Sequence, residues 1–573
     1  MPKPREKPCV TLRCMLFALL WSWIGVVFVA LRHMGPASGS SASWESATAS
    51  LAAQQQRPVR IEPARAAAAS GPAVAAGAPP PPPPPPRAAA FALKPGPPAA
   101  PIGEDVVDGL SVPKFWYPPQ GTDYDTVGSY VDGEPTIFLM VASYRDFQCR
   151  DTVISALERA QLPNRIRVGV VQQNAPGDVD CATPDTPCDS GVAGAEDHTL
   201  CARASQVEVY HMDAEAATGP VFARHIGHRM YRGESFVLQV DAHCVFVNRW
   251  DELLVTQWRE TRNERGVLTS YLTDLQGSVT PEGDSKRTTR PIMCNSAFEG
   301  AMPGRYLRHG AQPEEEPSIA GMPQLEPFWA AGFAFSRGHF VLRVPYDCCQ
   351  PMLFQGEEIS IGMRGWTFGY DYYAPRASVV FHEYAQKSAR RNAVHHFWEQ
   401  GSRHLGEDKR SARRAMALIG MAPDIDPATY DTTDAARYGM GTERPVQWFY
   451  DLFLIDVHKR ETAPGLCKFV KTGVMHRTFQ PSLRADGLGI DYSGLLGHDV
   501  RGAIEVEMAK DRPNAKLALE RAMSKRNLAG VQNALNMAER CMLQKADPEI
   551  MERGRALLKE LRANGARAGG AKV

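Results

Sequence analysis

The sequence predicts an α/β domain with a mostly parallel sheet flanked by helices, and two observations carry that prediction. From about residue 136, runs rich in β-branched and aromatic residues alternate with helical patterns, which is the order of strand–helix–strand units. One run, Phe236 to Val240, ends in Asp241-Ala242-His243. Polar groups directly after a buried strand are expected at the carboxyl edge of such a sheet, where ligands gather.

The predicted elements of the sheet follow one another along the chain, with a long cysteine-bearing loop between residues 171 and 207. Apolar positions at helical spacing and breaks at Pro163-Asn164 and Gly219-Pro220 separate them. We expect strands at 136–142, 166–171, 207–211 and 236–240, and helices at 151–161 and from 220 to about 232.

Asp241 and His243 are the strongest chemical signal. Side chains at i and i+2 of an extended chain leave on the same face, so both can reach one divalent cation if the extended chain continues through Ala242. An oxygen and a nitrogen ligand suit a metal such as Mn²⁺, which also takes phosphate oxygens.

Three later stretches, 328–336, 356–371 and 379–382, add candidate residues. The second reads as a helix opened by Glu357 and Glu358, where negative charge is favourable near the positive end of the helix dipole. Taken singly, two helix-start acids, a core Trp329 and a strand-end His382 are ordinary structural features. Their occurrence together, in this order, favours a functional site.

The N-terminus departs from globular composition. Residues 14–31 form an uncharged run of the length that spans a bilayer. Basic residues precede it in a tail at 1–13, which predicts a type II membrane anchor with the rest of the chain across the membrane. A cleaved signal peptide is the rival interpretation. Residues 35–110 are dominated by Ala and Pro and predict a disordered stem.

Composition bounds the remaining possibilities. The chain has 573 residues, a formal net charge of zero and a pI near 7.2, so no global field favours nucleic acid. Ten of the twelve cysteines follow residue 31. We expect a disulfide among Cys181, Cys188 and Cys201, but the sequence does not show which of them pair.

We expect the main domain at 130–465, a linker at 466–512 and a helical C-terminal region at 513–563. The sequence carries no signal for an oligomeric state.

The order of these motifs resembles the GT-A glycosyltransferases, and most closely glycosyltransferase family 60, the polypeptide α-N-acetylglucosaminyltransferases. Asp-x-His, a Gly-Glu helix start and a later histidine also occur in the related mucin-type transferases. The resemblance covers about 135–461 and lies in IFLMVASYRD (137–146), GPVFARHIGHRMYRGE (219–234), FVLQVDAHC (236–244), FWAAGFAFS (328–336), GEEISIGMRGWTFGYD (356–371), VVFHEY (379–384) and YGMGTERPVQWFYD (438–451).

Carried over by position, the resemblance implies a Rossmann-like GT-A fold, a divalent metal and a UDP-sugar donor. Its metal ligands would be Asp241, His243 and His382. Glu357 would hold the donor sugar with Glu358 nearby, and Trp329, Gly332 and Phe333 would shape the sugar and acceptor pocket. The nucleotide would be bordered by Ser143, Tyr144 and Arg145, with Gln172 or Gln173 near the uracil and Arg224 near the diphosphate.

The function so implied is a retaining, metal-dependent glycosyltransferase in the Golgi membrane. It would transfer a sugar, N-acetylglucosamine by resemblance, from a UDP-sugar to Ser, Thr or hydroxyproline of a polypeptide. Two alternatives stay open: a membrane-anchored sugar- or nucleotide-binding protein without catalysis, and a transferase with another donor sugar or a glycan acceptor.

Overall fold

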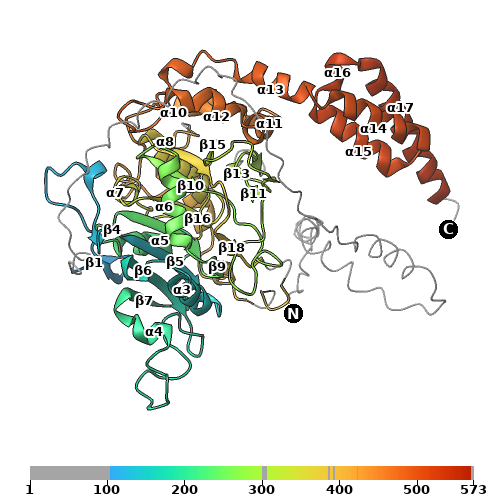
Figure 1. Cartoon of the computed structure of the whole chain (residues 1–573). Helices are drawn as coiled ribbons and strands as arrows, with labels where there is room; N and C mark the ends of the chain where they lie inside the picture. The colour runs from blue at the N-terminus through green and yellow to red at the C-terminus, as the bar shows by residue number, and fades with distance from the viewer. Residues whose placement is uncertain (1–102, 300–305, 385–387, 392–393, 423, 570–573) are drawn as a thin grey trace, which may run out of the picture. The chain divides into compact units, whose positions relative to one another are not determined.

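The computed structural model describes residues 103–299, 306–384, 388–391, 394–422 and 424–569, drawn in colour in Figure 1. The predicted tail, the anchor at 14–31 and most of the predicted stem lie outside the described residues. Among the residues that are described, no helix has the length and apolar character needed to cross a membrane.

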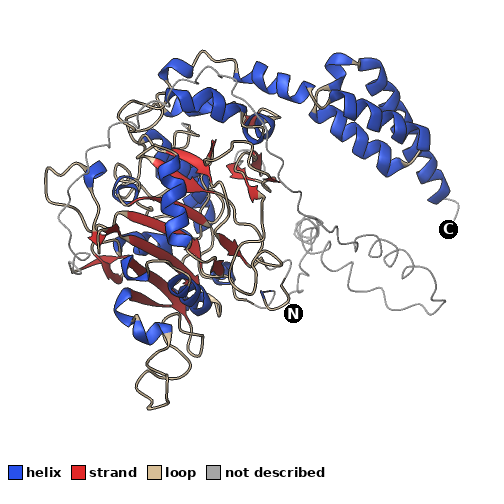
Figure 2. Cartoon of the chain, viewed as in Figure 1, coloured by secondary structure: helices blue, strands red, loops and turns tan. Residues whose placement is uncertain are grey.

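An eight-stranded mixed sheet forms the centre of the domain (Figure 2). Six strands run in one direction, and β16 and β15 run against them, so the predicted mostly parallel sheet is confirmed. In spatial order the strands are β15 (Gln324–Glu326), β17 (Asp371–Ala374), β10 (Gly266–Thr269), β16 (Phe333–Arg337), β8 (Phe236–Asp241), β5 (Ile137–Tyr144), β6 (Ile166–Asn174) and β7 (Val207–Asp213).

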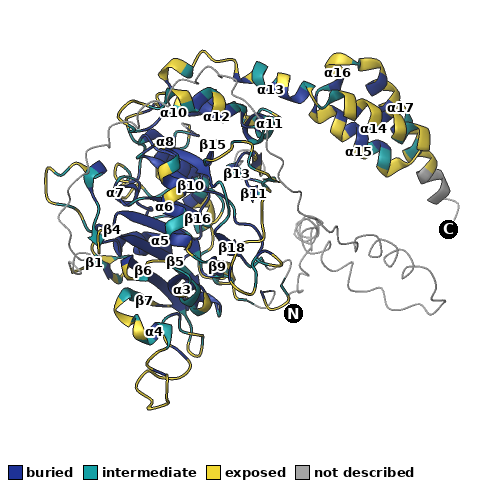
Figure 3. Cartoon of the chain, viewed as in Figure 1, coloured by how far each residue is buried: buried dark blue, intermediate teal, exposed yellow. Residues whose placement is uncertain are grey.

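Both faces of the sheet are buried, which explains the continuous apolar runs of its strands. Along β5, Leu139 and Val141 belong to one hydrophobic core, whereas Phe138 and Met140 belong to a second. Helix α3 (Cys149–Glu158) contributes to the first core and helix α5 (Pro220–Arg229) to the second. Figure 3 shows the strands as the buried layer between helices. The predicted helices and strands are present, with ends shifted by up to about three residues, as fraying ends allow.

The antiparallel strand β16 brings a distant segment to the end of β8. Its first residue, Phe333, pairs with Val240, and Arg337 pairs with Phe236. Gly332 therefore lies beside Asp241, and a Cβ atom at position 332 would lie 3.1 Å from Asp241 Oδ2. Glycine permits this close approach of the backbone to the carboxylate.

Further elements surround the sheet. Further helices, in chain order, are the short α4 (Thr199–Ala202), α6 (Trp250–Glu260), α7 (His339–Arg343), α8 (Glu357–Thr367), α9 (Glu407–Leu418) and α10 (Val446–Leu452). Paired short strands are β1 (Glu104–Val107) with β2 (Leu110–Pro113), β3 (Tyr130–Val131) with β4 (Glu134–Pro135), β9 (Cys244–Phe246) with β18 (Val380–His382), β11 (Arg290–Pro291) with β14 (Glu314–Glu315), β12 (Ser296–Glu299) with β13 (Tyr306–His309), and β19 (Ile455–Asp456) with β20 (Glu461–Thr462).

Two predicted boundaries are wrong. The stem does not extend to residue 110, because β1 and β2 pair from Glu104 to Pro113. The predicted linker at 466–512 is instead helical, with α11 (Leu466–Lys471), α12 (Val474–Phe479) and α13 (Val500–Ala509). Phe469 and Phe479 are fully buried in the main hydrophobic core, so this segment belongs to the main domain.

The C-terminal region is helical, as predicted. It contains α14 (Arg512–Lys525), α15 (Leu528–Arg540), α16 (Leu543–Ala546) and α17 (Pro548–Gly569), and the predicted break at Asp547-Pro548 separates the last two. Its helices bury their own cluster, which includes Leu519, Val531 and Leu535.

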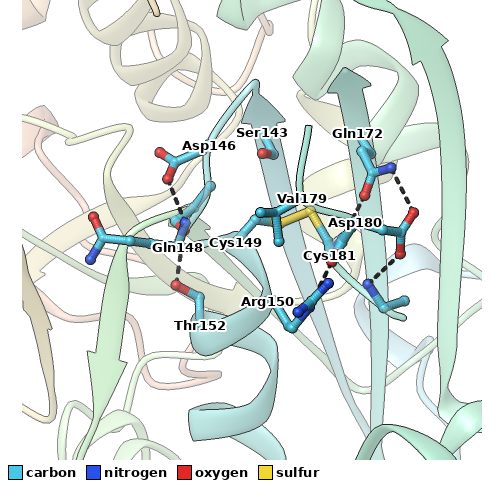
Figure 4. Close-up of a disulfide and its surroundings, with 12 residues drawn as sticks. Ser143, Asp146, Gln148, Cys149, Arg150, Thr152, Gln172, Val179, Asp180 and Cys181 are labelled. Atoms are coloured by element: carbon cyan, nitrogen blue, oxygen red, sulfur yellow. Dashed lines mark hydrogen bonds between the residues drawn. A yellow bond between two sulfur atoms is a disulfide. The ribbon is translucent and has the colours of Figure 1, made fainter. Parts of the chain in front are cut away.

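Disulfides fasten the loop that follows β6. Cys149, the first residue of α3, pairs with Cys181, and Cys188 pairs with Cys201, which settles the connectivity that the sequence left open. Figure 4 shows the first of these bridges between α3 and the loop. A third bridge joins Cys294 to Cys467 across 173 positions of the chain.

Candidate active site

A cavity of about 590 Å³ lies at the carboxyl edge of the sheet. The ends of β5, β6 and β8 contribute to its wall, as does the start of α8, where chain segments that are far apart in sequence converge. The predicted site residues that line it are Tyr144, Gln173, Arg224, Asp241, His243, Gly332, Glu357, Glu358 and His382.

The three predicted metal ligands lie together in this cavity. Asp241 ends β8, His243 follows two residues later, and His382 ends β18, which pairs with β9 directly after His243. One ligand atom from each residue lies within 4.8 Å of the other two. His382 Nε2 lies 3.3 Å from Asp241 Oδ2.

The protonation states of this cluster fit a bound cation. Burial alone would raise the pKa of Asp241, but His382 and Arg224 hold it below its usual value. Burial and the nearby His243 lower the pKa of His382, against the pull of Asp241. A carboxylate and a neutral imidazole are the forms that bind metals. In the part of the chain that the structure describes, the buried Nδ1 of His382 has no hydrogen-bond partner.

Asp146 orients one of these ligands, a contact that sequence reasoning missed. Its Oδ2 lies 2.9 Å from His243 Nδ1, and Arg391 Nη1 lies 2.9 Å and 2.7 Å from its two oxygens. When Nδ1–H donates to Asp146, Nε2 of His243 keeps its lone pair for a metal. Burial alone would raise the pKa of Asp146, but His243 and Arg391 lower it.

Arg224 links the Asp241–His243–His382 cluster to the acidic start of α8. Its Nη2 donates to Asp241 Oδ1 at 2.7 Å and its Nη1 to Glu357 Oε1 at 2.5 Å. The Tyr346 hydroxyl also donates to Glu357 Oε1, at 2.6 Å. Burial alone would lower the pKa of Arg224, but Glu357 and Asp241 raise it, so the guanidinium stays charged beside the cavity.

Glu358 has a different environment from its neighbour. Ala331 N–H donates to its Oε1 at 2.9 Å, and the Tyr271 hydroxyl donates to its Oε2 at 2.8 Å. Burial raises the pKa of Glu358 to about 7, and the charge of Glu357 adds to this effect. The two adjacent acids are therefore not equivalent.

The structure separates the predicted nucleotide contacts into two groups. Tyr144 and Gln173 line the cavity, and the buried Oε1 of Gln173 has no hydrogen-bond partner among the described residues. Gln172 instead donates to Asp180 at 2.8 Å and accepts from Cys181 N–H at 2.6 Å (Figure 4). Successive residues of a strand point to opposite faces, which is why the two glutamines differ.

Four other predicted residues also lie away from the cavity wall. The described residues that line the cavity include neither Ser143 nor Arg145, and neither Trp329 nor Phe333. Arg145 pairs with Asp178 at 2.7 Å. Ser143, Trp329 and Phe333 are almost fully buried, so their side chains pack in the interior behind the site. The order of the sequence motifs places these residues near the site but does not show toward which side their side chains point.

Several lining residues were not predicted from the sequence. Asp146 did have a sequence signal, because it ends the first motif of the resemblance and offers a carboxylate after a strand. Tyr271 and Phe354 come from loops and Trp398 from the short 3-10 helix Phe397–Ser402, and only the tertiary structure brings them to the cavity. Phe354 and Trp398 are half exposed, with ring centroids 5.8 Å apart.

A sequence-family comparison gives the class of protein. A family model described as "Glycosyltransferase (GlcNAc)" matches residues 136–196 and 187–459, which is more than half of the chain and includes every predicted site residue. The protein is therefore an enzyme, a glycosyltransferase. It belongs to this GlcNAc glycosyltransferase family.

Comparisons with solved structures return distant likenesses, and no curated protein matches the chain. GalNAc-T7 with UDP, GalNAc and Mn²⁺ shows 15% identity and a TM-score of 0.35 over 59% of this chain and 60% of its own length. S. aureus TarS 1-349 with UDP-GlcNAc shows 11% identity and 0.30, over 75% and 92%. The mannosyltransferase PcManGT from Pyrobaculum calidifontis with GDP-Man and Mn²⁺ shows 13% and 0.27, over 52% and 77%. These TM-scores are low, and membership of the family rests on the sequence match.

Proposed function

We propose that this enzyme transfers N-acetylglucosamine from UDP-N-acetylglucosamine to a hydroxyl group of a polypeptide, with retention of the anomeric configuration. The observation that carries the proposal is the opening of the Asp241–His243–His382 cluster, Arg224 and the Glu357–Glu358 pair onto one cavity. The GlcNAc family description supports the sugar. The narrower resemblance to family 60 supports Ser, Thr or hydroxyproline as the acceptor.

At the diphosphate end of the donor, the chain would supply a metal site and a fixed cation. Asp241, His243 and His382 would hold a divalent metal such as Mn²⁺, which neutralises negative charge on the departing diphosphate when bound. Arg224 would add a preorganised positive charge beside it. The free Oε1 of Gln173 would accept a hydrogen bond from the imide N–H of uracil.

At the sugar end, neither acid is placed as a free nucleophile. Glu357 Oε1 already accepts from Arg224 and Tyr346, and both oxygens of Glu358 accept hydrogen bonds. Retention, which the resemblance to family 60 implies, would then require the acceptor hydroxyl to attack the anomeric carbon from the face that UDP leaves. The C–O bond to the β-phosphate breaks, the new glycosidic bond forms, and the hydroxyl proton passes to the leaving phosphate.

We further propose that the enzyme is a single-pass type II protein of the Golgi membrane with a lumenal catalytic domain. This rests on the apolar run at 14–31 and the basic tail before it. The bridges between distant cysteines support it, since structural disulfides persist in oxidising compartments. Protection of the catalytic domain from added protease in sealed microsomes would test this orientation, and its digestion without detergent would contradict it.

The decisive experiment is calorimetric titration of UDP into the protein with Mn²⁺, with EDTA, and in the Asp241→Ala variant. We expect micromolar binding that is lost without metal or without Asp241. Asp408→Ala, at an exposed acid on α9, is the matched control and should bind normally. Metal-independent binding, or none, would contradict the proposed donor site.

A donor and acceptor screen then tests the specificity. Transfer from UDP-N-acetylglucosamine to a Ser/Thr or hydroxyproline peptide, with an α-linked product by NMR, is the expected result. Transfer of another sugar, or transfer only to a glycan, would contradict this proposal and support the alternative of a transferase with another donor sugar or a glycan acceptor. A covalent sugar adduct on Glu357 or Glu358 would overturn the same-face mechanism.

A further inference from the structure

Two adjacent cysteines lie on the segment 344–356, which joins α7 to α8. Cys348 and Cys349 form a disulfide with each other, and both are partly exposed to solvent. The bridge therefore links no distant parts of the fold, unlike Cys294–Cys467. Exposed disulfides are the ones that thiols reach and exchange with.

The chain before this pair is firmly held. Asp347 accepts from Arg414 through both oxygens, at 2.7 Å and 2.9 Å, and both side chains are buried. The carbonyl of Tyr346 accepts a hydrogen bond from His225 Nδ1–H at 2.8 Å. The backbone up to residue 347 is thus fixed from two sides.

The chain after the pair is held as well, and it then enters the active site. Met352 N–H donates to the Thr218 carbonyl at 2.5 Å, and the Ser411 hydroxyl donates to the Pro351 carbonyl at 2.6 Å. Phe354 lines the cavity, and α8 begins at residue 357. The cysteine pair lies between two anchors of one segment that also carries Tyr346, the partner of Glu357.

A metal site is the rival explanation for Asp347, Cys348 and Cys349, whose ligand atoms lie within 4.8 Å of one another. The contacts of Asp347 do not fit it. Both carboxylate oxygens are engaged by Arg414, and Oδ1 also accepts from Cys349 N–H at 2.9 Å. With the two sulfurs bonded to each other, no thiolate is available, so thiol–disulfide chemistry explains the pair better than a cation does.

We propose that Cys348 and Cys349 form a reversible disulfide–dithiol site that tightens or loosens the segment 344–356 at the active-site cavity. In the forward direction, one thiolate of an external dithiol attacks a protein sulfur and forms a mixed disulfide. Its second thiol then displaces the cysteine. The protein sulfurs gain two electrons and two protons, and the external dithiol becomes a disulfide. An external disulfide reverses the step.

The ring closed by adjacent cysteines restrains the backbone at residues 348 and 349, so its opening returns rotational freedom to that point. Tyr346 and Phe354 lie just beyond the two anchors. The loosening therefore acts on the Glu357 contact and on the cavity wall by weakening the Asp347 and Met352 contacts. The regulatory consequence rests on the proposed function: the dithiol form should bind the donor or acceptor less well.

The first test needs no catalysis. Mild dithiol treatment of the intact protein, followed by alkylation, should modify Cys348 and Cys349 together in the tryptic peptide 344–364. Amide hydrogen exchange within 348–355 should become about tenfold faster, as expected of a locally loosened segment. If the pair resists a treatment that opens the exposed Cys188–Cys201 bridge, or if exchange does not change after reduction, the proposal is wrong.

Variants separate this bridge from the others. In Cys188→Ser/Cys201→Ser, whose bridge lies in the loop after β6, dithiol should still accelerate exchange at 348–355. In Cys348→Ser/Cys349→Ser, exchange should be fast from the start and insensitive to dithiol, with KM raised about threefold if local opening precedes binding. A response that disappears in the first variant and persists in the second would overturn the assignment. The exchange readout stands even if no transferase activity is found, which distinguishes the two failures.

Discussion

Two adjacent glutamates at the start of α8 illustrate how environment differentiates identical side chains. Glu357 pairs with Arg224 and Tyr346, whereas Glu358 accepts from Ala331 N–H and the Tyr271 hydroxyl, with no cation among these partners. Desolvation without a compensating positive charge favours the neutral acid. Glu358 is thus half-protonated near neutral pH, whereas Glu357 is engaged in an ion pair.

This difference predicts a pH-dependent contribution to stability. The pKa of Glu358 rises from 4.5 to about 7 on folding, so the folded state binds the proton more tightly. The stabilisation is fully present below about pH 4.5 and is lost as the pH rises through 7. Relative to Glu358→Gln, the wild type should lose about 1–3 kcal/mol of unfolding free energy over this range. Urea denaturation of both proteins from pH 4.5 to 8 measures this, and parallel curves would contradict it.

A second prediction concerns Asp146, which orients His243 without itself being a proposed ligand. Asp146→Asn removes the charge that fixes the Nδ1–H tautomer, and Mn²⁺ binding should weaken about tenfold. Direct calorimetric titration of Mn²⁺ measures the change. Asp178→Asn, at the carboxylate that pairs with Arg145, is the matched control. Equal affinities in the wild type and Asp146→Asn would remove Asp146 from the site.

At the scale of elements, the segment 466–512 shows why helix boundaries were misjudged. Helices α11 and α12 begin after Gly465 and Gly473, which have positive φ angles and offer no side-chain cap. Ser, Thr, Asp or Asn would have marked these starts in the sequence, whereas glycine usually marks a helix end. The buried Phe469 and Phe479 reveal their structural role only in the folded chain.

Truncations test this division. Removal of residues 512–573 takes away helices with their own core and should leave the remaining domain folded and able to bind UDP with Mn²⁺. Removal of residues 466–573 also strips Phe469, Val470, Met475 and Phe479 from the main core, at a cost of about 3–5 kcal/mol for each large aromatic side chain. Circular dichroism and thermal unfolding should show a folded first fragment and an unfolded second one. Equal stability of both would contradict the reassigned boundary.

At the scale of the whole molecule, buried histidines make the fold sensitive to acid. Burial lowers the pKa of each below its usual value of 6.5, so these rings are neutral in the folded state. The pKa falls to about 3 for His225, His228 and His309 and to about 4 for His476, and it falls well below 6.5 for His339.

Their stabilising contribution is present above about pH 6.5 and is lost as the pH falls toward the folded-state values. Protonation of Glu358 stabilises the folded state on acidification and so acts in the opposite direction. The histidines with a lowered pKa outnumber the acids whose pKa is raised into the same range. The unfolding free energy should therefore fall by about 1–3 kcal/mol per pH unit below pH 6. Urea denaturation between pH 7 and 5 measures the slope. A flat or rising stability on acidification would show that these histidines are protonated in the folded state.

Much of the sheet was predictable because its signal is local. Strands buried on both faces require continuous apolar runs, and α3 and α5 require apolar positions at helical spacing. The Asp241–His243 pair was predictable because two ligand-type residues follow the end of a buried strand, although Ala242 and His243 form a turn and do not continue the extended chain. The hairpin at 104–113 was missed although its two-residue turn, Asp108-Gly109, has positive φ angles at both residues and is a local hairpin signal.

The sequence by itself determined the α/β class, the order of the sheet elements and the chemical types gathered at the strand ends, because these depend on residue spacing along one segment. Only the tertiary structure decided that Gln173 lines the cavity and Gln172 does not, that Asp146 orients His243, and that Arg224 bridges Asp241 to Glu357. The Asp146–His243 and Arg224–Glu357 contacts join residues far apart in the chain. Their partners are chosen by packing across strands and loops, which no local periodicity encodes.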